Sequence, residues 1–82
     1  MNEMKNAEVR RIVMGNRKKI GEHFREVREA QGWTTEQVAL MADIKAATVE
    51  KIEDGVFNVP MDVLSRVADV FGYELMIKPR TV

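Results

Sequence analysis

Apolar residues recur at helical spacing along most of this chain and alternate with polar ones only near its end. An early stripe predicts a helix from about residue 3 to residue 14, with a break at Gly15 and Asn16. That stripe consists of Met4, Val9, Ile12 and Val13. A second helix is predicted over about residues 17–31, because apolar side chains follow one another there at steps of four and three. These are Ile20, Phe24 and Val27.

The stretch from residue 32 to residue 55 reads as two short helices joined by a tight turn. Thr34 followed by Gln37 is a capping-box pattern, which starts a helix directly after the threonine. Asp43 tolerates a left-handed backbone and marks the turn. A second short helix should follow from about Ala46 and end at Gly55. The inward positions of the two helices are Val38, Ala39, Ala42, Val49 and Ile52.

The last part of the chain predicts a closing helix and then a strand. Pro60 suits the first position of a helix, and Gly72 ends it. The apolar stripe of this helix is wider than one small core requires, which indicates a second buried surface, most simply a dimer interface. Residues 73–78 alternate with a period of two, and such a strand would need a partner in a second subunit or in a bound protein. The predicted interface residues are Val63, Val67, Val70, Tyr73, Leu75 and Ile77.

Composition limits the class of protein. The 82 residues suit one small domain, and 45% hydrophobic residues indicate a folded one. No apolar run could span a membrane and no signal-peptide region is present, so a cytoplasmic location is expected. With no cysteine and the single histidine His23, no metal site and no cofactor are expected. No nucleophile has a plausible base beside it, so the chain is not expected to be an enzyme.

The net charge is zero, but the charges are unevenly distributed. Residues 1–33 carry eight Lys or Arg against five acids, and residues 34–82 carry five against eight. The basic half could face phosphates, although solvated surface charges explain the same pattern equally well. For the helix of residues 3–14, packing over the core or in a dimer is favoured over a basic arm on DNA, because its apolar stripe would be wasted on an arm.

An ordered set of residues at fixed spacing resembles the Cro and phage-repressor type helix-turn-helix, or xenobiotic-response-element family. The set consists of Arg28, Gly32, Thr34, Ala39, Val49, the run from Ile52 to Gly55 and the closing helix from Leu64 to Gly72. The resemblance covers roughly residues 20–75. It implies an all-α, compact lambda-repressor-like bundle of four to five helices. We expect a helical extension at 1–16, the helix-turn-helix domain at 17–72, and a short strand and tail at 73–82.

The resemblance also implies a function. It predicts a sequence-specific DNA-binding regulator, a dimeric repressor or the antitoxin of a toxin–antitoxin pair, that reads the major groove with the helix of residues 46–54. The alternative is a protein-interaction module that has lost specific readout, because Ala46 and Ala47 replace polar residues and Lys45 replaces the usual cap. Candidate base contacts are Lys45, Ala46, Ala47, Thr48 and Lys51. Candidate phosphate contacts are Thr34, Thr35, Asn58, Arg17 and Lys18. An ion pair between Arg28 and Glu53 is implied as well.

Overall fold

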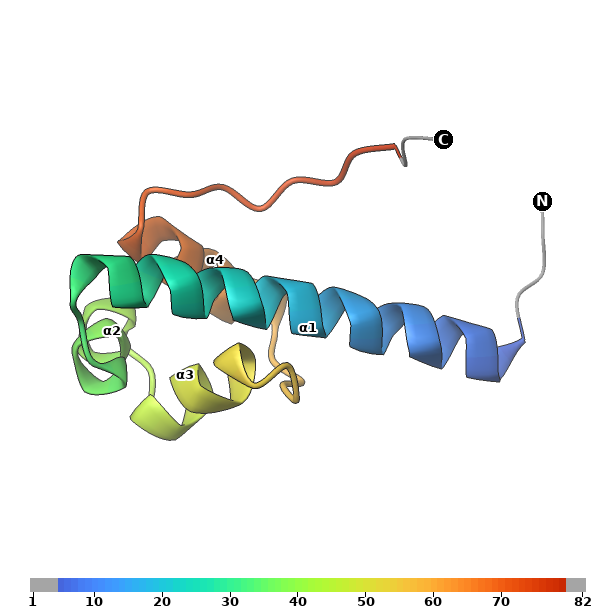
Figure 1. The fold of residues 1–82 in the computed structure, drawn as a ribbon, viewed down its shortest axis with the longest axis horizontal. Coiled ribbons are helices and arrows are strands. Elements are labelled where there is room, and N and C mark those ends of the chain that lie inside the picture. Colours follow the sequence, from blue (N-terminus) through green and yellow to red (C-terminus); the bar gives the residue numbers. More distant parts are fainter. Residues whose placement is uncertain (1–4, 80–82) are drawn as a thin grey trace.

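The described part of the chain is built from four helices. A computed structural model describes residues 5–79; residues 1–4, which include Met4 of the predicted stripe, and 80–82 lie outside that part. The helices are α1 (Asn6–Gln31), α2 (Thr35–Ala42), α3 (Ala46–Glu53) and α4 (Met61–Val70), as shown in Figure 1. The fold class is therefore all-α, as predicted. No helix within residues 5–79 is both long enough and apolar enough to cross a membrane.

α1 is one uninterrupted helix of 26 residues, so the predicted break at Gly15 and Asn16 is wrong. Nothing lies within 4 Å of the position that a Cβ of Gly15 would take, and glycine inside an exposed helix costs only about 1 kcal/mol relative to alanine. The helical turns on either side outweigh that cost. α1 ends instead at Gly32, whose φ of 71° is left-handed and whose amide donates to the carbonyl of Glu29 at 3.0 Å.

The core lies between the last half of α1 and the other three helices. Its packing pairs α1 with α3, α2 with α3, and α2 with α4. Gly21 permits the close approach of α1 to α3, because a Cβ there would overlap the carbonyl oxygen of Ile52 and lie 2.7 Å from that of Glu53. The buried apolar residues are Phe24, Val38, Ala39, Ala42, Val49, Ile52, Phe57, Leu64, Val67 and Ala68. The first half of α1 extends beyond this core (Figure 1).

The chain after α4 is extended and exposed, and the strand predicted at residues 73–78 does not form within the described chain. Residues 73–79 have no strand hydrogen bonds to any other described segment, although they run back alongside α1 (Figure 1). The alternating pattern is real, but a strand forms only where a second backbone supplies donors and acceptors. Val67 also corrects the sequence analysis: it is 1% exposed and belongs to the core, so it is not available to a dimer interface.

Candidate nucleic-acid interface

The start of α2 is fixed by reciprocal hydrogen bonds. The amide of Gln37 donates to the hydroxyl of Thr34 at 3.1 Å, and the amide of Thr34 donates to the Gln37 side chain at 2.7 Å. This is the capping box that the sequence predicted, and it satisfies two donors that the helix itself leaves free. Thr34 is exposed and Thr35 is half-buried. Both of these candidate phosphate contacts therefore stand at the start of α2.

The turn between α2 and α3 is tight and left-handed. Asp43 has a φ of 57°, and the amide of Ile44 donates to the carbonyl of Ala39 at 3.0 Å. Arg66 of α4 donates to the carbonyls of Ala42 and Asp43, both at 3.4 Å. These bonds occupy carbonyls that the end of a helix leaves unpaired, and they tie the turn to α4. The angle between α2 and α3 is thus fixed by the hydrogen bond within the turn and by the hydrogen bonds from α4.

One side of α3 is buried and the other faces solvent. Val49 and Ile52 pack into the core, at 2% and 1% exposure. The exposed side chains are Lys45, Ala47, Glu50 and Lys51, with Ala46 and Thr48 half-buried. No side chain caps the first turn, since Lys45 makes no such hydrogen bond. The five candidate base contacts therefore lie together at the start and along the outer side of one short helix, with the carboxylate of Glu50 beside them.

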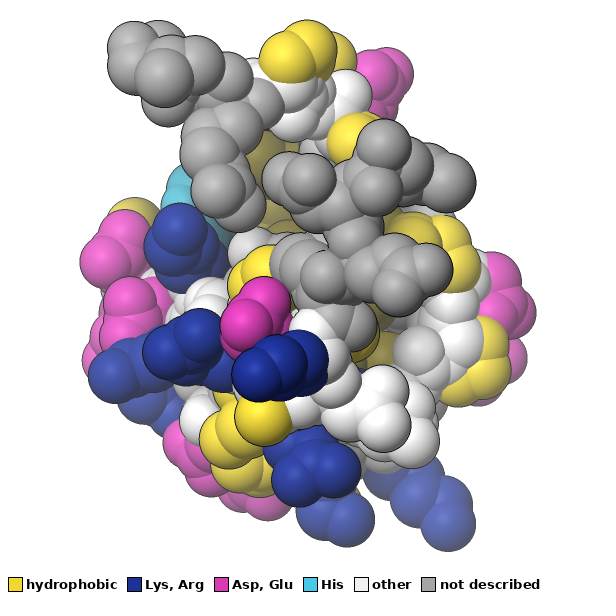
Figure 2. Space-filling view, turned by 90° about the vertical axis from the view of Figure 1, so that its right-hand side faces the viewer, with side chains coloured by type: hydrophobic (Ala, Val, Ile, Leu, Met, Phe, Trp, Pro, Cys, Tyr) yellow, Lys and Arg dark blue, Asp and Glu magenta, His cyan; other side chains and the backbone are white. Residues whose placement is uncertain are grey.

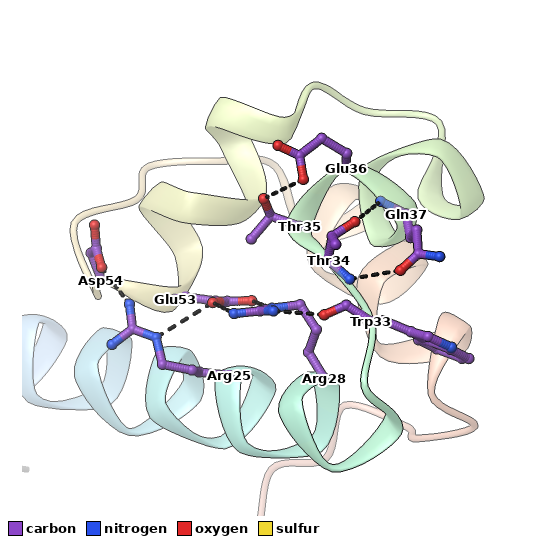
Figure 3. Close-up of polar contacts among 9 residues, drawn as sticks. All are labelled: Arg25, Arg28, Trp33, Thr34, Thr35, Glu36, Gln37, Glu53 and Asp54. Carbon is purple, nitrogen blue, oxygen red and sulfur yellow. Dashed lines mark hydrogen bonds and ion pairs between the residues drawn. The ribbon is translucent and has the colours of Figure 1, made fainter.

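The end of α3 is anchored to α1 by a buried carboxylate (Figure 3). Glu53 is 4% exposed and accepts hydrogen bonds from Nε and Nη2 of Arg28 at 2.6 and 2.9 Å. A third donor of Arg28 reaches the carbonyl of Trp33 at 2.7 Å. The hydrogen bonds to Glu53 raise the pKa of the Arg28 guanidinium, which therefore stays charged. The ion pair implied by the resemblance is thus present, and it fixes α3 against α1.

Arg25 is a member of this cluster that sequence reasoning missed. Its Nε lies 3.4 Å from Oε1 of Glu53, and its other end pairs with Asp54. The hydrogen bond to Asp54 is the main cause of a raised pKa at Arg25. The spacing of Arg25 and Arg28 on one side of a helix was a usable signal, because residues three apart are neighbours. Gly21 was also missed, and nothing local in the sequence marks it as a contact point.

The remaining candidate phosphate contacts are Arg17, Lys18 and Asn58. They lie near the C-terminal end of α3, close to Gly55. Gly55 has a φ of 74°, and a Cβ there would lie 2.9 Å from the Cα of Lys18. The guanidinium of Arg17 sits over the ring of buried Phe57, 6.0 Å from its centroid. Lys18 and Asn58 are exposed. The structure therefore brings Arg17 and Lys18 of α1 close to the loop that carries Asn58, whereas Thr34 and Thr35 stand at the start of α2.

Comparison with known proteins agrees with this geometry. Residues 24–77 match the model of a helix-turn-helix family. A candidate HTH-type transcriptional regulatory protein of Pyrococcus furiosus is 36% identical over 59 residues, which is 72% of this chain but only 18% of that relative. This chain therefore spans less than a fifth of that protein's length. No solved structure matches the chain significantly.

Proposed function

The chain belongs to the helix-turn-helix family of the Cro and phage-repressor type, and on that premise we propose that it is a transcriptional regulator that reads double-stranded DNA with α3. The observation that supports this most strongly is the division of α3 into two sides. Its inner side is locked by core packing and by the buried carboxylate of Glu53. Its outer side offers Lys45, Ala47 and Lys51 to solvent, as a helix that enters a major groove requires.

The chemistry of the outer side suits base edges. The ammonium groups of Lys45 and Lys51 can donate to O6 and N7 of guanine, and the methyl groups of Ala46 and Ala47 can contact thymine methyls. Phosphate contacts from the candidate residues around α3 would fix its register on the duplex without reading sequence. We assign that role to Thr34, Thr35, Asn58, Arg17 and Lys18. The hydroxyl of Thr48 can donate or accept a hydrogen bond at a base edge, so it does not favour one base strongly.

We further propose that the regulator acts as a homodimer and a repressor. Two copies would read two half-sites about one helical turn apart. Supporting this, the exposed segment after α4 carries Tyr73, Leu75 and Ile77 at 46%, 38% and 99% exposure, and α1 adds Val9 and Ile12 at 41% and 38%. Val63 and Val70 are half-buried and remain candidates for the same interface. Burying such apolar side chains against a second copy would remove them from water.

Selection of bound duplexes from a random pool tests the proposal. The wild-type protein should recover an inverted repeat. Lys51→Ala should weaken binding to that repeat by about 1–3 kcal/mol and relax the preference at one position. Lys78→Ala is the matched control, because Lys78 is exposed on the segment after α4 and far along the chain from α3. Equal binding by Lys51→Ala and wild type would remove α3 from the reading face.

A second candidate function is a protein-interaction module. A groove of about 750 Å³ lies between α1, α4 and the last described segment, and is lined by apolar Ile20, Leu64 and Leu75 among others. An antitoxin would combine this surface with the DNA-binding one. Salt separates the two functions, because phosphate neutralisation makes DNA binding fall steeply as salt rises. Binding to a protein partner through an apolar groove would change little over the same range.

A further inference from the structure

The first half of α1 projects away from the core. Residues 6–16 are exposed except for half-buried Glu8, and they precede the stretch that matches the family. We propose that this projecting half is a second DNA-contacting element, in which Arg10 and Arg11 hold backbone phosphates outside the groove read by α3. The inference rests on the proposed function, and it adds a contact surface that the helix-turn-helix itself does not contain.

The position of Gly21 shows which side of α1 faces α3. A Cβ on Gly21 would meet the backbone of Ile52 and Glu53, so this side of α1 lies directly on the end of α3. An α-helix advances about 100° per residue, which places Arg10 roughly 20° and Arg11 roughly 80° from Gly21 around the helix axis. Arg17 and Lys18 lie roughly 40° and 60° from it by the same count. Four cations of α1 therefore share the side that looks toward α3.

No acid of the projecting half shares that side. Glu8 is the acidic residue of residues 6–18, and the same count places it roughly 140° from Gly21. Figure 2 views the molecule along α1 from its N-terminal end; Lys and Arg side chains lie mainly across the lower half of that face, with Asp, Glu and hydrophobic side chains among them. α3 lies below α1 in the matching orientation of Figure 1. A phosphate backbone approached by α3 would thus meet a basic side of α1 to which residues 6–18 contribute no carboxylate.

The exposed apolar residues of the projecting half are divided between the two sides of α1. Val9 and Ile12 lie roughly 120° and 180° from Gly21, on the opposite side of the helix, whereas exposed Val13 and Met14 lie roughly 80° and 20° from it, on the basic side. The objection that an apolar stripe would be wasted on a DNA-binding arm therefore does not apply to Val9 and Ile12. One side of the projecting half can contact DNA while the other side packs against protein.

The projecting half of α1 is held rigidly and is long enough to contact a phosphate backbone beyond α3. α1 is continuous through Gly15, and its second half is fixed to α3 by the contact at Gly21 and by the ion pairs of Arg25 and Arg28 with Glu53. Eleven residues separate Gly21 from Arg10, which at 1.5 Å per residue is about 16 Å along the axis. That exceeds the roughly 12 Å width of a major groove. Arg10 and Arg11 can therefore reach a backbone at the border of the groove that α3 occupies.

Salt-dependent binding of two charge-matched double variants tests the inference. The probe is the duplex recovered from the random pool, and the slope of log affinity against log salt is measured for wild type, Arg10→Gln/Arg11→Gln and Lys5→Gln/Lys19→Gln. Lys5 and Lys19 lie roughly 160° from Gly21, so the control removes the same charge from the other side of α1. Each lost phosphate contact reduces the slope by about 0.9. The arginine variant should be shallower by about 1.8, so wild type loses about 12-fold more affinity than this variant between 50 and 200 mM salt.

The control pair should retain the wild-type slope. Backbone cleavage by hydroxyl radicals should show positions, at the border of each half-site, that wild type protects and the arginine variant does not. Equal slopes for the arginine variant and wild type would overturn the arm but leave α3 as the reading helix. Equal reductions in both double variants would also overturn it, since that result indicates overall charge and not a contact. Failure of the wild-type protein to bind any duplex would overturn the arm together with the proposed function.

Discussion

Replacing Glu53 with Gln removes the negative charge from the buried cluster while nearly preserving its shape. In the structure the Glu53 side chain is 4% exposed and accepts two hydrogen bonds from Arg28. Glutamine would keep one acceptor but turn an amide NH2 group toward guanidinium donors. Removing one partner of a buried pair costs about 3–5 kcal/mol. Arg28 is 15% exposed and keeps its hydrogen bond to the Trp33 carbonyl, so we expect the lower end, about 3 kcal/mol.

That loss is large for a domain of this size. Stability of roughly 0.05–0.15 kcal/mol per residue corresponds to about 4–12 kcal/mol for the whole chain. At about 4–8 °C per kcal/mol, the melting temperature should fall by about 12–24 °C. Urea denaturation followed by circular dichroism gives the free energy of unfolding, and a thermal scan gives the melting temperature. Glu50→Gln is the control, because it removes the same charge from an exposed position of the same helix.

The reasoning fails if the two variants behave alike. Glu50→Gln should change the free energy of unfolding by no more than about 0.5 kcal/mol, as exposed substitutions usually do. A Glu53→Gln protein within that same range would show that the carboxylate contributes little to stability. A double variant with Arg28→Met added should recover part of the loss, since an unpaired buried charge is what makes the single change costly.

Two further predictions concern α1. Gly21→Ala should lower the free energy of unfolding by about 1–3 kcal/mol, because its Cβ would press on the end of α3. Gly15→Ala should raise the free energy of unfolding by up to about 1 kcal/mol. Urea denaturation compares the two variants, and equal effects would contradict the packing at Gly21. Ile12→Asn should shift the protein toward monomer in sedimentation velocity, while Leu40→Asn, at an exposed position of α2, should not. A wild-type monomer at high concentration would refute the dimer.

Local signals in the sequence were sufficient for the helix-turn-helix itself. The capping box of Thr34 and Gln37, the left-handed turn at Asp43 and the terminator Gly55 each depend on a few neighbouring residues, and all three are present. The periodicity of α3 likewise identified its buried side. Such features are predictable because the residues that make the interaction are close together in the chain.

Features that depend on distant residues were predicted poorly. The alternation of residues 73–78 indicated a strand, but a strand needs a second backbone that the described chain does not supply. Gly15 was predicted to break the helix because glycine disfavours a helix at its own position. Helix formation is cooperative, however, and the turns on either side carry the helix through Gly15. Val67 looked available for a dimer, but it is 1% exposed and belongs to the core that the four helices form together. Arg25 acquired its role only once folding brought Glu53 and Asp54 beside it.

The unbroken α1 also sets a rule for how this chain can change in length. Because no loop separates the projecting half from the half that packs on α3, any deletion between Arg11 and Gly21 rotates everything before it. Loss of one residue turns the preceding segment by about 100°, whereas loss of seven turns it by only about 20°. Chain length in this stretch is therefore constrained by rotational phase: an arm shortened by two turns would keep its orientation, and one shortened by a single residue would not.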